Sequence, residues 1–171
     1  MLEKPYEEVR LMSVAIIPAY GHEQEIKILF TEYTQMLMDN DKFMRQYLAA
    51  QHYDDEVKNL RGKYGEPEGR LYLAYVESKA AGCIALRKLD ERRCEMKRLY
   101  VRPQFRNHKL GEQLVDKIIG EAKKIGYRHM LLDTIPFLHS AIHLYHKHGF
   151  YEIDKYNDNP DGNAIYMQLD L

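Results

Sequence analysis

The stretch "RLYVRPQFRNHKLGEQLVDKI" (residues 98–118) decides the fold, because it joins an apolar, strand-like run to an amphipathic helix through a basic corner. At the start of a helix, three or four backbone N–H groups lack an intrahelical partner, and the helix dipole adds partial positive charge. Such a corner binds anions, and Arg102, Arg106 and Lys109 would add contacts that suit a diphosphate. A solvated helix start has a similar composition, and neither G-x-x-x-x-G-K-[ST] nor G-x-G-x-x-G is present in the chain.

Three strand-like runs precede and enter this corner. Residues 70–76 and 80–89 are separated by "ESK", a pattern that is typical of a β-hairpin. Residues 94–101 follow across "DERR" and are expected to form a third antiparallel neighbour.

The alternation of apolar residues in the third run shifts by one position. Cys94 and Met96 share one face, whereas the next apolar residues, Leu99 and Val101, have the opposite parity. Because strand side chains alternate with a period of two, this change indicates one inserted residue. We predict a β-bulge at the Lys-Arg pair, residues 97–98.

A clear helical stripe follows the corner and ends at Gly126, which suits a helix C-cap. The stripe consists of Leu110, Leu114, Val115, Ile118, Ile119, Ala122 and Ile125. Residues 129–134 then have the composition of a buried strand. Strand, helix and strand form a βαβ unit, so 94–101 and 129–134 are expected to be parallel neighbours.

The C-terminal third contains one more helix and two strands. A helix is predicted over 138–148, closed by Gly149. The strands 151–156 and 163–171 flank the turn "NDNPDGN" and are expected to form an antiparallel pair.

The N-terminal part is less regular. A short strand is predicted in 13–21 and an amphipathic helix over 22–38. Residues 39–69 are polar and mixed, with a short helix around 54–61. Together the elements predict an α/β protein whose residues 1–171 form a single domain.

Composition limits the function classes. The 25 Lys and Arg residues balance the 26 Asp and Glu residues to a formal charge of −1, so no global field favours nucleic acid or an anionic membrane. No apolar run approaches the roughly 20 residues of a membrane span. The opening "MLEKPYEEVR" lacks the apolar core of a signal peptide, and two cysteines make no disulfide framework. We therefore expect a cytoplasmic protein.

The sequence resembles the GCN5-related N-acetyltransferase (GNAT) family, whose signature [Q/R]-x-x-G-x-[G/A] opens a central helix. "RNHKLG" meets this signature at Arg106 and Gly111, but Lys109 stands in place of its middle glycine. "EMKRLYVRPQFR" and "LDTIPFLHSAIHLYHKHGF" are similar to two further family segments, in the same order. The resemblance covers residues 12–171, and the lysine at 109 raises the question of whether the phosphates would be crowded.

The resemblance implies a mixed, mostly antiparallel central sheet with a splayed parallel strand pair, flanking helices and acetyl-CoA as co-substrate. The pantetheine arm would insert at the splayed strand, against Leu99, Tyr100 and Val101. The diphosphate would bind the corner residues Arg106, Asn107, His108, Lys109, Leu110, Gly111 and Glu112.

The same resemblance implies direct acetyl transfer to a primary amine in a ternary complex. Tyr145 matches the tyrosine that protonates the departing sulfur, although its spacing from Ala141 and Ile142 also fits a core aromatic residue. Glu95 matches a catalytic glutamate, although a solvent-facing strand residue is the alternative. The oxyanion would be held by a backbone N–H in 99–101.

The resemblance implies a small-molecule or peptide amine as the acceptor, with Tyr33, Tyr156 and Asn157 as candidate residues of its pocket. His139 and His143 are spaced to share a metal, but no further ligand completes a site, so we expect none. Oligomeric state is open, a homodimer included. Two other functions compete: a non-catalytic acyl-CoA binding or sensing module, and a nucleic-acid-binding protein that uses the basic corner.

Overall fold

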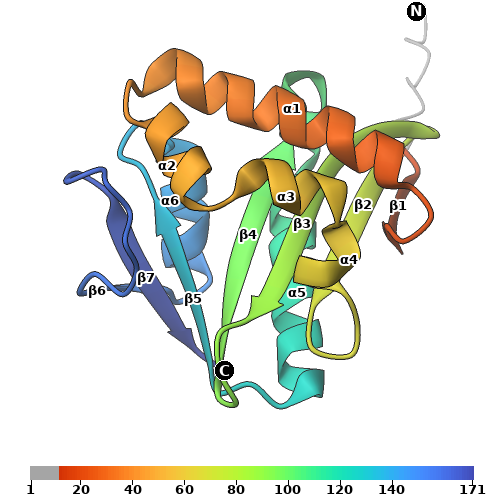
Figure 1. Ribbon diagram of the computed structural model, residues 1–171. Coiled ribbons are helices and arrows are strands. Elements are labelled where there is room, and N and C mark those ends of the chain that lie inside the picture. Colours follow the sequence, from red (N-terminus) through yellow and green to blue (C-terminus); the bar gives the residue numbers. More distant parts are fainter. Residues whose placement is uncertain (1–11) are drawn as a thin grey trace, which may run out of the picture.

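The computed structural model describes residues 12–171, so the prediction about a signal peptide at residues 1–10 lies outside the described residues. One sheet with strand order β1-β2-β3-β4-β5-β7-β6 forms the centre (Figure 1). Its strands are β1 (Val14–Pro18), β2 (Arg70–Val76), β3 (Lys79–Lys88), β4 (Arg93–Val101), β5 (His129–Thr134), β6 (Tyr151–Ile153) and β7 (Ile165–Asp170). In the described sheet β4 and β5 run parallel, and all other neighbours are antiparallel. The predicted fold class is therefore confirmed.

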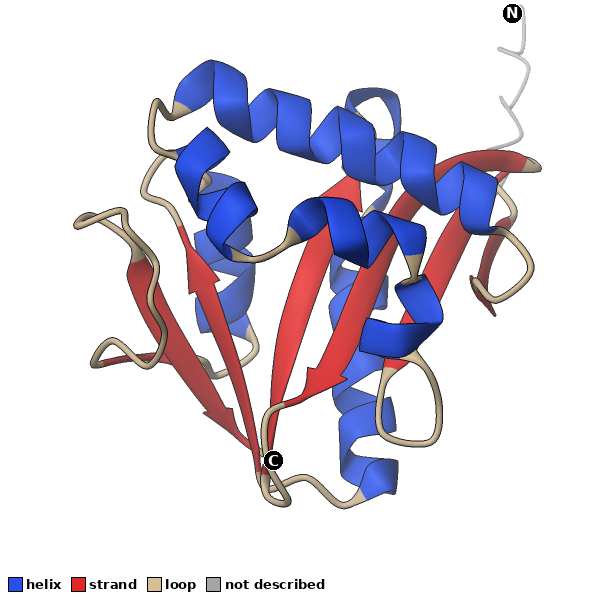
Figure 2. Cartoon of the chain, viewed as in Figure 1, coloured by secondary structure: helices blue, strands red, loops and turns tan. Residues whose placement is uncertain are grey.

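Helices cover both faces of this sheet (Figure 2). The helices are α1 (Glu23–Asn40), α2 (Met44–Ala50), α3 (Tyr53–Lys58), α4 (Leu60–Tyr64), α5 (Leu110–Ile125) and α6 (His139–Lys147), with a 3-10 turn at Pro103–His108. Helices α1 to α4 lie on one face, and α5 and α6 lie on the other. The predicted stripe of α5 packs Leu110, Leu114 and Ile118 into the larger core with no exposed surface. A second core, under α1 and α4, contains Phe30 and Tyr64.

The predicted β-bulge is present in β4. Cys83 lies opposite Tyr100, but Ala85 lies opposite Lys97, so β4 holds one extra residue between the two pairs. Arg98 carries the irregularity with a φ of 59°. A positive backbone φ is uncommon for a residue with a long side chain, and the surrounding contacts keep Arg98 in this conformation.

The bulge determines which side chains face α1 to α4. In a regular strand Lys97 and Arg98 would point to opposite faces. Here the Lys97 ammonium lies 5.9 Å from the centroid of the Tyr47 ring, and the Arg98 guanidinium lies 5.3 Å from that of Tyr53. Both cations therefore reach the same helical layer, while Leu99 packs toward the core under α5.

The parallel strands β4 and β5 separate along their length. They pair at Arg93 with His129, Cys94 with Met130 and Glu95 with Leu131. Beyond these pairs the two ribbons diverge toward α1 and α2 (Figure 1). The facing edges of the opening have no strand partner among the described residues, so their backbone groups are free to bind another molecule.

The structure corrects the predicted bounds in two places. The sequence predicts one helix over 54–61, but the chain forms α2, α3 and α4, with a break at Asn59. The Asn59 side chain accepts a hydrogen bond from the backbone N–H of Gly62 at 2.9 Å, which starts α4. The penultimate strand ends at Ile153 instead of residue 156.

Candidate active site

A cavity of about 50 Å³ lies in the opening between β4 and β5, and we call it the wedge cavity. Tyr145 from α6, Tyr33 from α1 and Leu99 from β4 line it. The Tyr145 hydroxyl has no hydrogen-bond partner in the described part of the chain, and burial, followed by Tyr33 and Asp133, raises the pKa of this phenol. A protonated hydroxyl without a partner thus faces the wedge.

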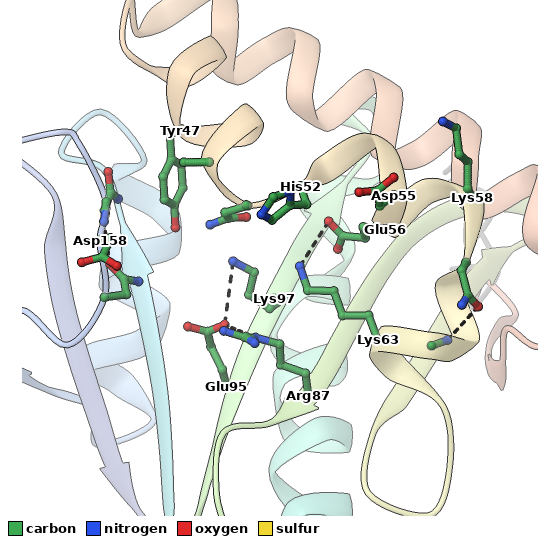
Figure 3. Close-up of a pocket in the computed structure, with 16 residues that line it drawn as sticks. Tyr47, His52, Asp55, Glu56, Lys58, Lys63, Arg87, Glu95, Lys97 and Asp158 are labelled. Atoms are coloured by element: carbon green, nitrogen blue, oxygen red, sulfur yellow. Dashed lines mark hydrogen bonds and ion pairs between the residues drawn. The ribbon is translucent and has the colours of Figure 1, made fainter.

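A second cavity of about 760 Å³ lies on the side of α2, α3 and α4, and we call it the outer cavity (Figure 3). Glu95 and Asn157 line it, together with basic side chains from β3, β4 and α4. Tyr47, Lys97 and Asn159 line both cavities. The wedge cavity and the outer cavity therefore meet at these three residues.

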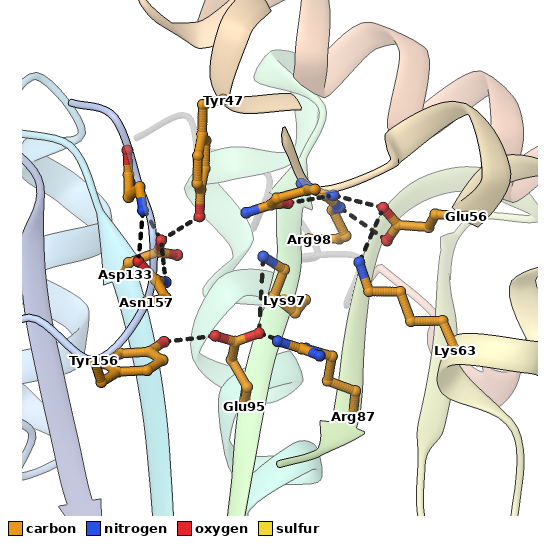
Figure 4. Close-up of polar contacts among 12 residues, drawn as sticks. Tyr47, Glu56, Lys63, Arg87, Glu95, Lys97, Arg98, Asp133, Tyr156 and Asn157 are labelled. Carbon is orange, nitrogen blue, oxygen red and sulfur yellow. Dashed lines mark hydrogen bonds and ion pairs between the residues drawn. The ribbon is translucent and has the colours of Figure 1, made fainter. Parts of the chain in front are cut away.

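Asp133 of β5 ties the walls of this junction together. Its carboxylate accepts hydrogen bonds from the Tyr47 hydroxyl, from Asn157 Nδ2 at 2.9 Å and from Asn159 Nδ2 at 3.3 Å (Figure 4). Burial alone would raise its pKa, but the Lys97 charge and these hydrogen bonds lower it. An ionised carboxylate thus holds α2, β5 and residues 157–159 in place.

Glu95 is only 1% exposed, so the alternative of a solvent-facing strand residue is wrong. Its Oε1 accepts from Arg87 Nε at 2.7 Å, and its Oε2 accepts from the Tyr156 hydroxyl at 2.6 Å. Lys97 Nζ lies 3.8 Å from Oε1. Of the predicted acceptor residues, Asn157 lines the outer cavity with Glu95, Tyr156 contacts Glu95 without lining the cavity, and Tyr33 lines the wedge cavity.

A buried ion pair forms the wall between the two cavities. Arg98 Nη2 lies 2.5 Å from Glu56 Oε2, and the Tyr64 hydroxyl also donates to this carboxylate. Burial alone would raise the pKa of Glu56. The positive charges of Arg98 and Lys63 have the larger effect and lower this pKa to about 2. The bulge at Arg98 therefore positions one partner of a fully buried charge pair.

The basic corner differs from the prediction in one respect. Arg102 does not face outward, because its guanidinium binds Glu32 of α1 at 2.7 Å and the carbonyl oxygen of Ala80 at 2.9 Å. Arg106 donates its Nε–H to the Val101 carbonyl at 2.9 Å but is otherwise exposed.

The other predicted corner residues divide between solvent and core. Asn107 is exposed and His108 is half-buried. Leu110 is buried in the core, so it offers only its backbone to the corner. The Glu112 carboxylate binds Lys147 of α6 at 2.9 Å.

The three predicted residues of β4 also face different ways. Leu99 lines the wedge cavity. Tyr100 instead packs on Tyr33, with ring centroids 5.8 Å apart, and Val101 packs into the core under α5. Neither the Tyr100 nor the Val101 side chain therefore lines the wedge cavity.

Lys109 takes the backbone conformation that a glycine would have at this position. Its φ of 53° and ψ of 26° place it in the left-handed region, and its side chain is exposed. The lysine therefore keeps the turn into α5 at the cost of local strain, about 1–2 kcal/mol for a residue with a Cβ.

We expect Lys109→Gly to raise the free energy of unfolding by about 1 kcal/mol, because glycine adopts this conformation without strain. The midpoint of thermal unfolding should rise by about 2–4 °C for a chain of this size. Lys109→Ala is the matched control, since it removes the same charge but keeps the Cβ. An equal gain in both variants would mean that charge, and not strain, is responsible.

Several residues of this site carried no recognisable sequence signal. Tyr47 lies in a stretch without clear periodicity, and Asp133 has the pattern of a buried strand. Lys97 could have been found, since two adjacent cations between the apolar residues Met96 and Leu99 are unusual in a strand. Within residues 12–171 no His, Cys, Asp and Glu side chains gather as a metal site, and no helix there is long and apolar enough to cross a membrane.

A central sheet opened between two parallel strands, with a helix starting at its mouth and two cavities meeting inside, defines a class of acyl-transferring enzymes. Residues 30–150 match the acetyltransferase (GNAT) family. An uncharacterised N-acetyltransferase of Schizosaccharomyces pombe is 41% identical over 94% of this chain and 95% of its own. One from Dictyostelium discoideum is 31% identical over 94% of this chain and all of its own length. The chain therefore belongs to the GNAT family and is an N-acetyltransferase.

Solved structures share the same fold at low sequence identity. A Streptococcus agalactiae acetyltransferase superposes with a TM-score of 0.75 at 20% identity, over 92% of this chain and 98% of its own. The PaiA N-acetyltransferase of Thermoplasma acidophilum, in complex with coenzyme A, has a TM-score of 0.70 at 18% identity, over 94% of this chain and all of its own.

Proposed function

We propose that this enzyme transfers an acetyl group directly from acetyl-CoA to a primary amine, with the thioester in the wedge cavity and the amine in the outer cavity. The observation that carries this proposal is the junction at Tyr47, Lys97 and Asn159, where the two cavities meet. Two reactants that enter from separate sides can react there without a covalent enzyme intermediate.

The corner at the start of α5 supports diphosphate binding. The backbone N–H groups of residues 110–112 begin this helix, and the first intrahelical bond runs from Gln113 N to Lys109 O. A Cβ added at Gly111 would meet its nearest atoms at 3.5 Å, in Leu144, and 4.0 Å, in Val101. These are ordinary van der Waals distances, so Gly111 lies against α6 and β4, and the N–H groups of residues 110–112 without an intrahelical partner are what a phosphate would bind.

The cysteines support direct transfer. Cys83 and Cys94 are the two cysteines of the chain, and both are fully buried. Burial raises the pKa of both thiols, that of Cys94 to about 12, and neither lines the wedge or the outer cavity. An acetyl-cysteine intermediate would need an accessible thiolate. Mass spectrometry of the enzyme after incubation with acetyl-CoA alone should show no acetyl adduct, and a stoichiometric adduct would contradict direct transfer.

The proposed reaction assigns the proton transfers to two residues. The acceptor ammonium loses a proton to Glu95 through water in the outer cavity, and the neutral nitrogen attacks the thioester carbonyl. The C–N bond forms, the C–S bond breaks, and the thiolate takes a proton from the Tyr145 hydroxyl, which solvent then restores. The second amine proton passes to solvent water as the amide forms, and this balances the proton that solvent returns to Tyr145.

We expect Glu95→Gln to reduce kcat/KM about a hundredfold at pH 7, since a base is needed while the amine is protonated. The deficit should shrink as the pH approaches about 10, where the amine itself loses its proton. A pH profile of thiol release would measure this change. If the pH profiles of the wild type and of Glu95→Gln are parallel, Glu95 is not the base.

We expect Gly111→Glu to weaken acetyl-CoA binding at least about tenfold, a loss of about 1.4 kcal/mol, because it places a negative side chain at the helix start. Gly120→Glu is the matched control on the same helix, where an added Cβ meets nothing within 4 Å. Calorimetric titration with acetyl-CoA measures both. Equal affinities for the two variants would place the diphosphate elsewhere.

The function as a whole is tested by titrating the purified protein with acetyl-CoA and then measuring thiol release with a panel of amines. Binding followed by amine-dependent release supports the proposal. If acetyl-CoA does not bind, the assignment of the corner and the wedge cavity is wrong.

A further inference from the structure

The two buried carboxylates that line the outer cavity, Glu56 and Glu95, already have protein partners. Glu56 is neutralised by Arg98, whose Nη2 lies 2.5 Å away. Both oxygens of Glu95 accept hydrogen bonds, one from Arg87 at 2.7 Å and one from Tyr156 at 2.6 Å. These two carboxylates therefore have their charges balanced without the remaining lysines.

Lys63 and Lys97 are left as additional cations on the cavity wall (Figure 4). Lys63 Nζ is a second cation beside Glu56, at 3.4 Å, and Lys97 Nζ lies 3.8 Å from Glu95. Asp55 and Asp158 also line the cavity, but both are exposed to solvent. With Asp133 included, which faces Lys97 at the junction, four cations (Lys63, Arg87, Lys97 and Arg98) meet three anions (Glu56, Glu95 and Asp133), so the inner part keeps one positive charge in excess.

Lys97 is the residue that most requires an external partner. Its side chain is 6% exposed, and its ammonium group makes no hydrogen bond to the described residues. An ammonium has three donors, and a buried charge without hydrogen bonds is costly. Burial lowers the pKa of Lys97, and that of Lys63 to about 8, as expected for cations that lack a full set of anionic partners.

We propose that the acceptor amine also carries a carboxylate, which binds Lys97 and Lys63, so that the substrate is a small amino acid. This inference rests on the proposed function and names the substrate class of the same site. The volume of about 760 Å³ suits a small molecule. Lys97 lines both cavities, so a carboxylate bound there keeps the amine within a few bonds of the thioester.

Matched pairs of acceptors test the proposal by thiol release. Glycine, β-alanine and 4-aminobutyrate are each compared with their carboxamides, which keep the amine and lose the negative charge. For the best pair we expect kcat/KM to be at least about tenfold higher for the acid, mainly because its KM is lower. The carboxamide loses the charge-assisted hydrogen bond to the lysine, and about tenfold is the usual size of such a loss. Lys97→Met should reduce this preference to less than about threefold. Lys58→Met, a charge loss at an exposed residue of the same cavity, should leave it unchanged.

A binding experiment separates failure of this inference from failure of the proposed function. The N-acetyl derivatives of the same acids and amides are titrated into the enzyme with CoA present, so no turnover is needed. The proposal is supported if the wild-type enzyme binds an acid but not its amide and the Lys97→Met variant no longer binds that acid. This result counts even where thiol release is slow. Equal binding of acid and amide, or no binding of any acid to an enzyme that binds acetyl-CoA, overturns it. A Lys97→Met variant that loses kcat equally for acids and amides also overturns it, because Lys97 would then act on the proton.

Discussion

Replacing Tyr145 by phenylalanine is expected to lower kcat by about two to three orders of magnitude, the usual contribution of a positioned general acid. Acetyl-CoA affinity should stay within about twofold, because the ring and its contact with Phe150, at 5.7 Å between centroids, are retained. The hydroxyl has no protein partner in the described chain, so its loss leaves no other group unsatisfied. Steady-state kinetics together with calorimetric titration measure both quantities.

The raised pKa of Tyr145 does not argue against this role. Burial disfavours the charged form of a phenol and of a thiol alike, so both pKa values rise in the wedge cavity. With ordinary values of about 10 and 8.5, proton transfer from tyrosine to thiolate is uphill by only about 2 kcal/mol. Tyr166→Phe is the matched control, since its buried hydroxyl also lacks a partner and lines neither cavity. Equal kcat for Tyr145→Phe and Tyr166→Phe would exclude Tyr145 as the acid.

The buried pair of Glu56 and Arg98 is expected to dominate the acid stability of the protein. Glu56→Gln should lower the free energy of unfolding by about 3–5 kcal/mol, because it leaves a buried guanidinium without its counter-ion. Denaturant unfolding at pH 7 measures this loss. Glu91→Gln is the control, since Glu91 pairs with Lys88 in an exposed position and its loss should cost at most about 1 kcal/mol.

The pH dependence of this loss follows from the pKa of Glu56. A folded pKa of about 2, below the ordinary value of 4.5, means that the unfolded chain binds the proton first as the pH falls. The stabilisation is therefore complete above about pH 4.5 and is lost as the pH falls toward 2. The difference between wild type and Glu56→Gln should shrink over the same interval. A difference that stays constant from pH 6 to pH 3 would mean that another interaction is responsible.

The sequence predicted the elements whose geometry depends on local pattern. The parity change between Met96 and Leu99 located the bulge, because strand side chains alternate strictly. The stripe from Leu110 to Ile125 located α5, and the chain order predicted the parallel neighbours β4 and β5.

The remaining part of the site depends on tertiary packing. Helices α2 to α4 have five to seven residues each, too short to be stable alone, so the sequence indicated only one short helix in this region, around 54–61. Tyr47 and Lys63 were missed for this reason. Periodicity also cannot show which cavity a tyrosine lines, and Tyr33 was assigned to the acceptor side although it lies in the wedge cavity.

The separation of β4 from β5 also bears on solubility. A typical open sheet has two edges, but this one has a further pair of unpaired borders inside it, beyond Glu95 and Leu131. Exposed strand borders invite pairing with other copies of a chain and promote aggregation. Here α1 and α2 lie over one side of the gap and α6 lies over the other, so a foreign strand is kept out (Figure 1). The enzyme can therefore keep unpaired strand backbone available for a narrow ligand without becoming prone to self-association.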